Sequence, residues 1–177
     1  MGRLFRKDIS LPFGKEYFIS ALVGSETGIA VTAAIVLGLN AVDEPLPIIL
    51  TTLLVTIMVQ AFNSSIGSLL SIVTEREIEG EEHKRPHLPL MSATLQFGTY
   101  IFSSMIPLLP LIFISDFELA FSITPVVALV SLLAIGFLKG RYIKRNTFDH
   151  AATVFLSGAA VISVGYLTGV ILEQLGA

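Results

Sequence analysis

Charged residues, cysteine and tryptophan are scarce or absent in this sequence. Only 25 of the 177 residues are charged, which is 14% of the chain, whereas about 25% is usual in a soluble domain. The net charge of −3 and the hydrophobic share of 53% exclude a disordered chain, a collagen-like chain and nucleic-acid binding through bulk positive charge. Without cysteine there are no disulfides, thiolate metal ligands or cysteine nucleophiles, and without tryptophan any aromatic belt depends on 12 Phe and 4 Tyr. This composition predicts a membrane protein.

Five long apolar runs divide the sequence. Each has at least 20 residues, and a helix needs roughly 20 to cross the hydrocarbon core of a bilayer. Glu26 is the one charged residue within them. Helices of a soluble core do not separate charge from apolar sequence this cleanly. The predicted fold is therefore all-α, with five transmembrane helices at residues 17–39, 46–71, 91–114, 119–138 and 150–172.

The basic residues predict the orientation of these spans. All 11 Lys and Arg lie before the first span, between the second and third, or between the fourth and fifth. The other two loops and the C-terminal segment contain only acidic residues among the charged types. Because basic loops stay in the cytoplasm, the N-terminus is expected inside and the C-terminus outside. Five spans require opposite ends, so the count and the orientation agree.

The sequence predicts an N-terminal arm at residues 1–16 and a five-helix transmembrane domain at residues 17–177. Residues 1–16 are expected to form a cytoplasmic arm, either as an amphipathic helix on the inner leaflet or as a frayed basic segment. Within the transmembrane domain, one stretch lies outside the membrane. Residues 72–90 form this acidic cytoplasmic stretch. No helix breaker precedes Gly80, so the second helix is expected to continue into the cytoplasm.

The acidic stretch contains candidate metal ligands. Glu75, Glu79 and Glu82 follow helical spacing and would share one face, with His83 beside them. Carboxylates together with imidazoles can bind divalent first-row metals. The alternative is a solvated, charged linker whose acidic groups pair with neighbouring basic ones.

Proline and glycine mark where helices break or approach one another. Pro107 and Pro110 each remove a backbone donor and are expected to kink or loosen the third span. Small residues let membrane helices come close. The expected packing positions are Gly28, Gly158 and Gly165.

Glu26 is expected about 13 Å into the first span, where a charge is costly. No Lys or Arg lies within any predicted span, so an ion pair with a basic residue inside a span is excluded at this stage. A proton, hydrogen bonds or a bound cation remain as compensation for the carboxylate.

Several polar residues are predicted at a similar depth. They are Gln60, Asn63 and Ser64 on the second span and Tyr100 on the third. With Glu26 they would form a polar transport pathway whose oxygen atoms suit a proton or a hard cation. The alternative for the hydroxyl groups is that each bonds the backbone of its own helix.

The order of these features resembles the vacuolar iron transporter family over nearly the whole chain. The likeness rests on Glu26-Thr27-Gly28 and Gly38-Leu39, on AFNSSIGSLLSIVTERE from residue 61, on Pro107-Leu-Leu-Pro110, and on Gly158 and Gly165. The resemblance implies export of ferrous iron and similar divalent metals from the cytosol in exchange for protons. It also implies a homodimer, with a pathway lined by the first two spans near the two-fold axis.

The sequence departs from that family at the expected pathway. Thr27 stands where the family has Asp, Ser64 stands where it has Met, and the large Glu-rich cytoplasmic insertion is missing. The predicted function is proton-coupled transport of Fe²⁺- or Mn²⁺-like cations in a lipid bilayer. This would be the plasma membrane of a prokaryote or a vacuolar membrane in a eukaryote. The alternatives are a non-transporting dimeric scaffold or regulator and a proton-coupled transporter of another solute. No enzymatic activity, required cofactor or nucleic-acid partner is expected.

Overall fold

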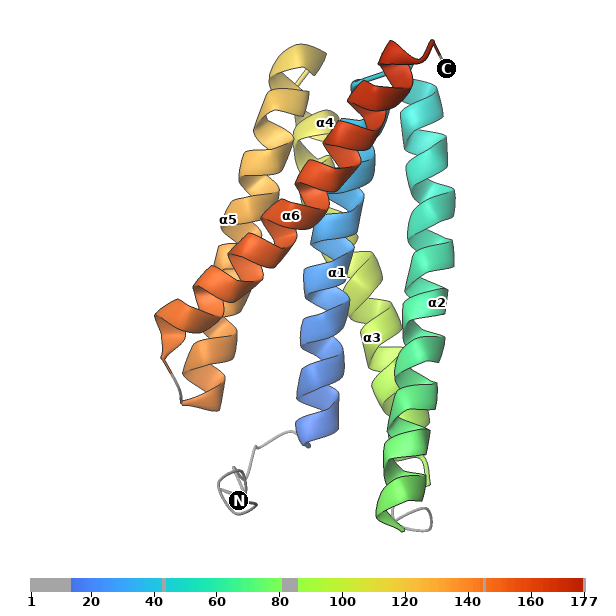
Figure 1. Ribbon diagram of the computed structural model, residues 1–177, viewed down its shortest axis with the longest axis vertical. Coiled ribbons are helices and arrows are strands. Elements are labelled where there is room, and N and C mark those ends of the chain that lie inside the picture. Colours follow the sequence, from blue (N-terminus) through green and yellow to red (C-terminus); the bar gives the residue numbers. More distant parts are fainter. Residues whose placement is uncertain (1–13, 43, 81–85, 145, 177) are drawn as a thin grey trace.

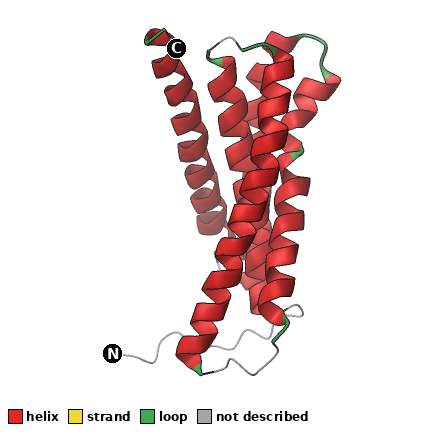
Figure 2. Ribbon diagram, turned by 90° about the vertical axis from the view of Figure 1, so that its right-hand side faces the viewer, coloured by secondary structure: helices red, strands yellow, loops and turns green. Residues whose placement is uncertain are grey.

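The computed structural model describes residues 14–42, 44–80, 86–144 and 146–176, which form a bundle of helices with no strand in this part of the chain. Figure 1 shows the segments running lengthwise, and Figure 2 shows the connecting loops gathered at the two ends. In order, the elements are α1 (Lys15–Asn40), α2 (Leu46–Glu79), α3 (Leu88–Ser104), a 3₁₀ turn η1 (Ile106–Leu108), α4 (Leu109–Phe113), α5 (Phe117–Ile143) and α6 (Thr147–Gln174).

Five helical segments are long and apolar enough to cross a membrane, with α3, η1 and α4 together making the third. The predicted all-α fold with five such helices is therefore confirmed. Many large apolar side chains face outward, among them Leu54, Phe102 and Val164 at 64%, 79% and 64% exposure. Lipid, unlike water, covers such a surface without a free-energy cost. The protein is an integral membrane protein.

The two ends of the bundle differ in charge. The end where α2 and α5 finish and α1, α3 and α6 begin carries Arg76, Arg141 and Lys144 together with acidic residues such as Glu16 and Glu75. We call it the basic end because the described Lys and Arg lie toward it. The opposite end carries Glu44, Asp116, Glu118 and Glu173, and we call it the acidic end. α1 starts at the basic end and α6 finishes at the acidic end, as Figure 1 shows. The predicted inside and outside correspond to the basic and acidic ends.

Local sequence explains where the helices begin and end. α2 runs on to Glu79 and finishes at Gly80, whose φ of 68° lies in the left-handed region that favours glycine. The Asp116 side chain accepts a hydrogen bond from the Leu119 amide at 3.2 Å and so caps α5. Pro107 and Pro110 coincide with the break of the third segment into α3, η1 and α4.

Glycines set the closest helix contacts. A methyl group added to Gly24 would lie 2.6 Å from the Gln96 carbonyl oxygen, so α1 packs against the backbone of α3. Gly28 makes the same approach to Tyr100 and Ser103 one turn later. The other close approaches are Gly38 to Gly165, Gly136 to Ala151, Gly140 to Thr147, Gly158 to Leu132, Gly165 to Ala34 and Gly169 to Gly38.

Two apolar clusters make up the core. One joins the part of α1 nearest the acidic end with α2, α3, η1, α4 and the start of α5, and includes Leu53, Ile57 and Tyr100. The other joins α1, α5 and α6 around Ala30 and Leu132. The α5–α6 turn lies closer to the middle of the bundle than the ends of α2 and α3 at the basic end (Figure 1). The part of α1, α2 and α3 nearest the basic end therefore extends beyond α5 and α6.

Candidate functional site

Glu26 forms an ion pair with Lys139 of α5. Lys139 Nζ lies 3.1 Å from Glu26 Oε1, and the two side chains are 28% and 22% exposed. The exclusion of an ion pair between Glu26 and a basic residue inside a span is therefore wrong. The predicted fourth span ended at Leu138, but α5 continues to Ile143 and carries Lys139 within it. A lysine stem is long and flexible enough to place its ammonium group beside a carboxylate on a neighbouring helix.

Glu26 also lies apart from the polar residues with which the sequence grouped it. Gly24 and Gly28 both face α3, and Glu26 is two residues from each. Two residues turn a helix by about 200°, so the carboxylate lies on the far side of α1, toward α5 and α6. There it borders a small cavity of about 180 Å³ with Thr27 and Ser157.

A second cavity lies between α1, α2 and α3 near the basic end, and we call it the three-helix cavity. Its volume is about 430 Å³. Carboxylate, hydroxyl and amide groups share its walls with apolar ones. The polar lining residues are Glu16 and Ser20 from α1, Ser64, Ser68, Ser71 and Glu75 from α2, and Gln96 from α3.

Gln96 connects two walls of the three-helix cavity. The residue is 4% exposed, and its Nε2 donates to the hydroxyl oxygen of Ser64 at 2.6 Å and to the Ser64 carbonyl at 3.1 Å. Other hydroxyls near this level bond the backbone of their own helix, as Ser65 does with Ala61 and Thr99 with Leu95.

The remaining predicted pathway residues do not line the three-helix cavity. Gln60 is half-buried and Asn63 is exposed, and neither side chain bonds another described residue. Ala61 and Ser65 face the interior, so Asn63, two residues from each, faces outward. Tyr100 is 2% exposed in the apolar cluster with Ile57, and its hydroxyl has no hydrogen-bond partner in the described part of the chain. Within the one chain described, Glu26, Gln60, Asn63, Ser64 and Tyr100 therefore do not meet in one site, because they share a depth but lie on different helix faces.

The acidic candidates separate in a similar way. Glu75 lines the three-helix cavity, whereas Glu79 is exposed one turn further along α2. Glu82 and His83 lie outside the described residues. Among the residues that are described, no group of three or more His, Asp and Glu side chains is close enough to hold a metal ion.

The sequence interpretation missed three residues at these sites. Glu16 was assigned to the cytoplasmic arm, Ser20 was not singled out, and Lys139 was placed in a loop. Glu16 lies eight residues before Gly24 and Ser20 lies four residues before it. This spacing places all three along one side of α1. That spacing was available in the sequence.

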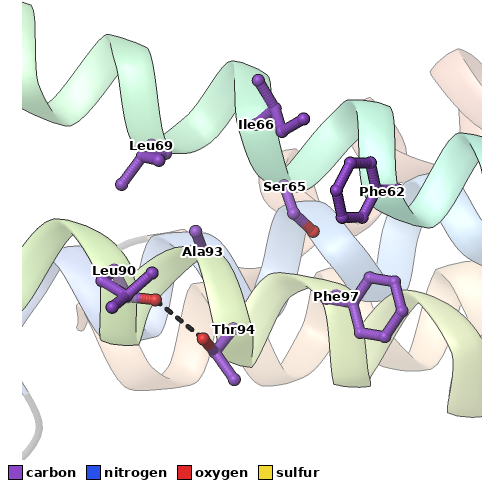
Figure 3. Close-up of a pocket in the computed structure, with 8 residues that line it drawn as sticks. All are labelled: Phe62, Ser65, Ile66, Leu69, Leu90, Ala93, Thr94 and Phe97. Carbon is purple, nitrogen blue, oxygen red and sulfur yellow. Dashed lines mark hydrogen bonds between the residues drawn. The ribbon is translucent and has the colours of Figure 1, made fainter.

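A third hollow, between α2 and α3, is apolar. Its volume is about 310 Å³, and Figure 3 shows its lining side chains, including Phe62, Leu69 and Phe97. The Thr94 hydroxyl drawn there donates to the carbonyl of Leu90, at 2.9 Å. Its lining has no carboxylate or amide side chain and only the two hydroxyls of Ser65 and Thr94, so this hollow is a poor site for a divalent cation.

Comparison with known proteins then places the chain in a family. Residues 58–170 match the profile described as the VIT family, which covers more than half of the sequence. The chain belongs to the VIT family. It is 23% identical over 170 residues to Vacuolar iron transporter homolog 5 of Oryza sativa subsp. japonica, covering 90% of this chain and 82% of the relative. It is 19% identical to Vacuolar iron transporter homolog 1 of Arabidopsis thaliana, covering 85% and 80%. A shorter match of 32% identity over 87 residues reaches rice Vacuolar iron transporter 1, covering 49% and 34%. The VIT-family resemblance predicted from the sequence is confirmed.

Proposed function

We propose that this VIT-family protein transports divalent metal cations, Fe²⁺ or Mn²⁺ in type, out of the cytosol in exchange for protons. Relatives named as vacuolar iron transporters support metal transport. The observation that carries the proposal is the three-helix cavity, because it places two carboxylates, four hydroxyls and an amide among membrane helices.

The chemistry of the three-helix cavity fits a cation that keeps part of its water shell. Carboxylate, hydroxyl and amide oxygens suit Mn²⁺ and other hard cations, and Fe²⁺ accepts them as well. Ser64 supplies a hydroxyl where a thioether would favour softer metals. We therefore expect weaker discrimination between Mn²⁺ and Fe²⁺ than a methionine at residue 64 would give.

The cavity lies at the basic end, which the distribution of Lys and Arg assigns to the cytosol. A cation would enter between Glu16 and Glu75 and leave toward the acidic end through the apolar cluster around Ile57. Protons that reach the cavity would neutralise the same carboxylates and so release the cation bound there. Cations and protons would then move in opposite directions. A homodimer of this chain, implied by the family resemblance, is part of the proposal.

Flux measurements in proteoliposomes test this function. We expect the purified protein to move Fe²⁺ and Mn²⁺, and Glu16→Gln combined with Glu75→Gln to slow flux by about tenfold, equivalent to about 1.4 kcal/mol of cation binding. Glu118→Gln, which removes an exposed carboxylate at the acidic end, is the matched control. Unchanged flux in the double variant would show that the cation does not pass through the three-helix cavity. If the protein neither moves metal nor binds it by calorimetry, a non-transporting dimeric scaffold or regulator is favoured. If another solute moves under a proton gradient, a proton-coupled transporter of that solute is favoured.

A further inference from the structure

Near the basic end, α1 and α5 are joined through side chains. Glu26 pairs with Lys139 at 3.1 Å, and two to three turns toward the start of α1 the ring of Phe18 stacks on Tyr142 with centroids 3.8 Å apart. The two contacts lie on one line, because Lys139 and Tyr142 are about one turn apart on α5. These two contacts supplement the apolar packing of α1 on α5 around Ala30 and Leu132.

Close backbone contacts involve α6, which packs on both α1 and α5. Toward the acidic end, a methyl group added to Gly165 would meet the carbonyl of Ala34, so α6 packs directly on α1. At the basic end α5 and α6 approach each other at Gly140 and Thr147. The α5–α6 pair is thus a close-packed unit that touches α1 by backbone at one end and by side chains at the other.

The ion pair removes the need for another ligand at Glu26. A carboxylate at this level requires compensation, and the ammonium group of Lys139 supplies a full opposite charge at hydrogen-bond distance. The neighbouring small cavity offers only the hydroxyls of Thr27 and Ser157 as further polar side chains. Three oxygen-bearing side chains with one charge, already neutralised, are a poor set for a divalent cation.

We propose that Lys139 is the permanent counter-ion of Glu26, so that the pair ties α5 to α1 and Glu26 does not bind the transported cation. The effect of the Glu26–Lys139 pair on flux rests on the proposed function, whereas the ion pair between α1 and α5 does not. Lys139 is then a positioning residue: it acts through α1 and leaves the three-helix cavity to hold the cation.

A double-mutant cycle tests the pair. Glu26→Gln and Lys139→Gln each leave one charge without its partner and are expected to lower the midpoint of thermal unfolding in detergent by about 2–6 °C. The double variant should recover most of that loss, because the effects of contacting residues are not additive. Arg141→Gln, an exposed basic residue two positions along α5, is the matched control and should leave the midpoint unchanged. Additive losses would overturn the tie.

Flux separates a tie from a cation ligand. The Glu26→Gln/Lys139→Gln variant should transport within about twofold of the wild-type rate, and the exchanged pair Glu26→Lys/Lys139→Glu should do the same. If Glu26 bound the cation, both double variants would lose flux, and that result would overturn the proposal. If the wild-type protein moves no metal, the proposed function fails, while the unfolding cycle still decides whether the tie exists.

Cross-linking tests directly whether residues 26 and 139 lie close together in the membrane. The chain has no cysteine, so Glu26→Cys/Lys139→Cys introduces a unique pair of thiols. A short bifunctional thiol reagent should join them within one chain, whereas Glu26→Cys/Arg141→Cys should react poorly. Equal reaction of both pairs would contradict the placement of Lys139 beside Glu26.

Discussion

The side-chain amide of Gln96 donates to both the hydroxyl and the carbonyl oxygen of Ser64, and so joins α3 to α2 at the wall of the three-helix cavity. Gln96→Leu removes both bonds and leaves the Ser64 groups without their donor. We expect a loss of about 1–2 kcal/mol in the free energy of unfolding, with slower cation flux. Chemical denaturation in detergent and liposome flux measure the two effects.

Ser64→Ala separates these contributions, because it removes the hydroxyl acceptor and leaves the carbonyl. Its cost in stability should be smaller than that of Gln96→Leu, and the double variant should lose less than the sum of the two. Independent, additive losses would contradict a direct contact between these residues.

Close packing at Gly24 predicts a strong effect of a small change. The added side chain in Gly24→Val would meet the backbone of Gln96, and overpacking of this kind costs about 1–3 kcal/mol. Thermal unfolding measures the loss. Gly98→Ala on α3 is the control, since nothing lies within 4 Å of its added methyl group, and it should be neutral or slightly stabilising. A neutral Gly24→Val would mean that α1 and α3 are further apart than described.

The break in the third segment is bonded to α5 through Thr124. Its buried hydroxyl lies 3.4 Å from the carbonyl of Pro107 and 3.0 Å from that of Ala120. Thr124→Val keeps the shape and removes the donor, so we expect about 0.5–1.5 kcal/mol of destabilisation. Ser122→Ala, whose exposed hydroxyl bonds only its own helix at Glu118, should have little effect. Equal effects would show that the bond to Pro107 contributes nothing.

Gly80 ends α2 in the left-handed conformation. Any side chain there is strained, so Gly80→Ala should destabilise the end of α2 by about 1 kcal/mol. Hydrogen exchange should rise in the last two turns of α2, which carry Glu75, and stay unchanged in the middle of the helix. Protection that falls uniformly along α2 would argue against a local cap.

The fold was predictable from the sequence because the bilayer restricts the possible structures. Backbone groups in hydrocarbon must bond within their own segment, so each long apolar run becomes a helix. The break at Pro107 and Pro110 follows from missing backbone donors. The end of α2 at Gly80 follows from glycine's access to positive φ.

The site was harder to predict, and Glu26 explains why. Hydropathy locates the end of an apolar run, but α5 continues past that point, so Lys139 was assigned to a loop although it lies within the helix. Depth alone then grouped Glu26 with Ser64, although Gly24 and Gly28 turn the carboxylate away from α2 and α3. Which neighbour occupies each face depends on tertiary packing, which a single sequence does not specify.

Under the proposed function, the length of α2 determines where the membrane voltage would act on the cation. Its 34 residues span about 51 Å, and even a tilt of 40° leaves about 39 Å against a hydrocarbon core of about 30 Å. Since α2 is longer than the hydrocarbon core, we expect its basic end to reach the headgroup layer. Ser71 and Glu75 near that end line the three-helix cavity, so its mouth is expected there as well. A divalent cation gains or loses about 4.6 kcal/mol per 100 mV across the whole field. On the proposed route most of that energy would act during the step through the apolar cluster around Leu53 and Ile57, so we expect membrane potential to control exit from the cavity more than entry into it.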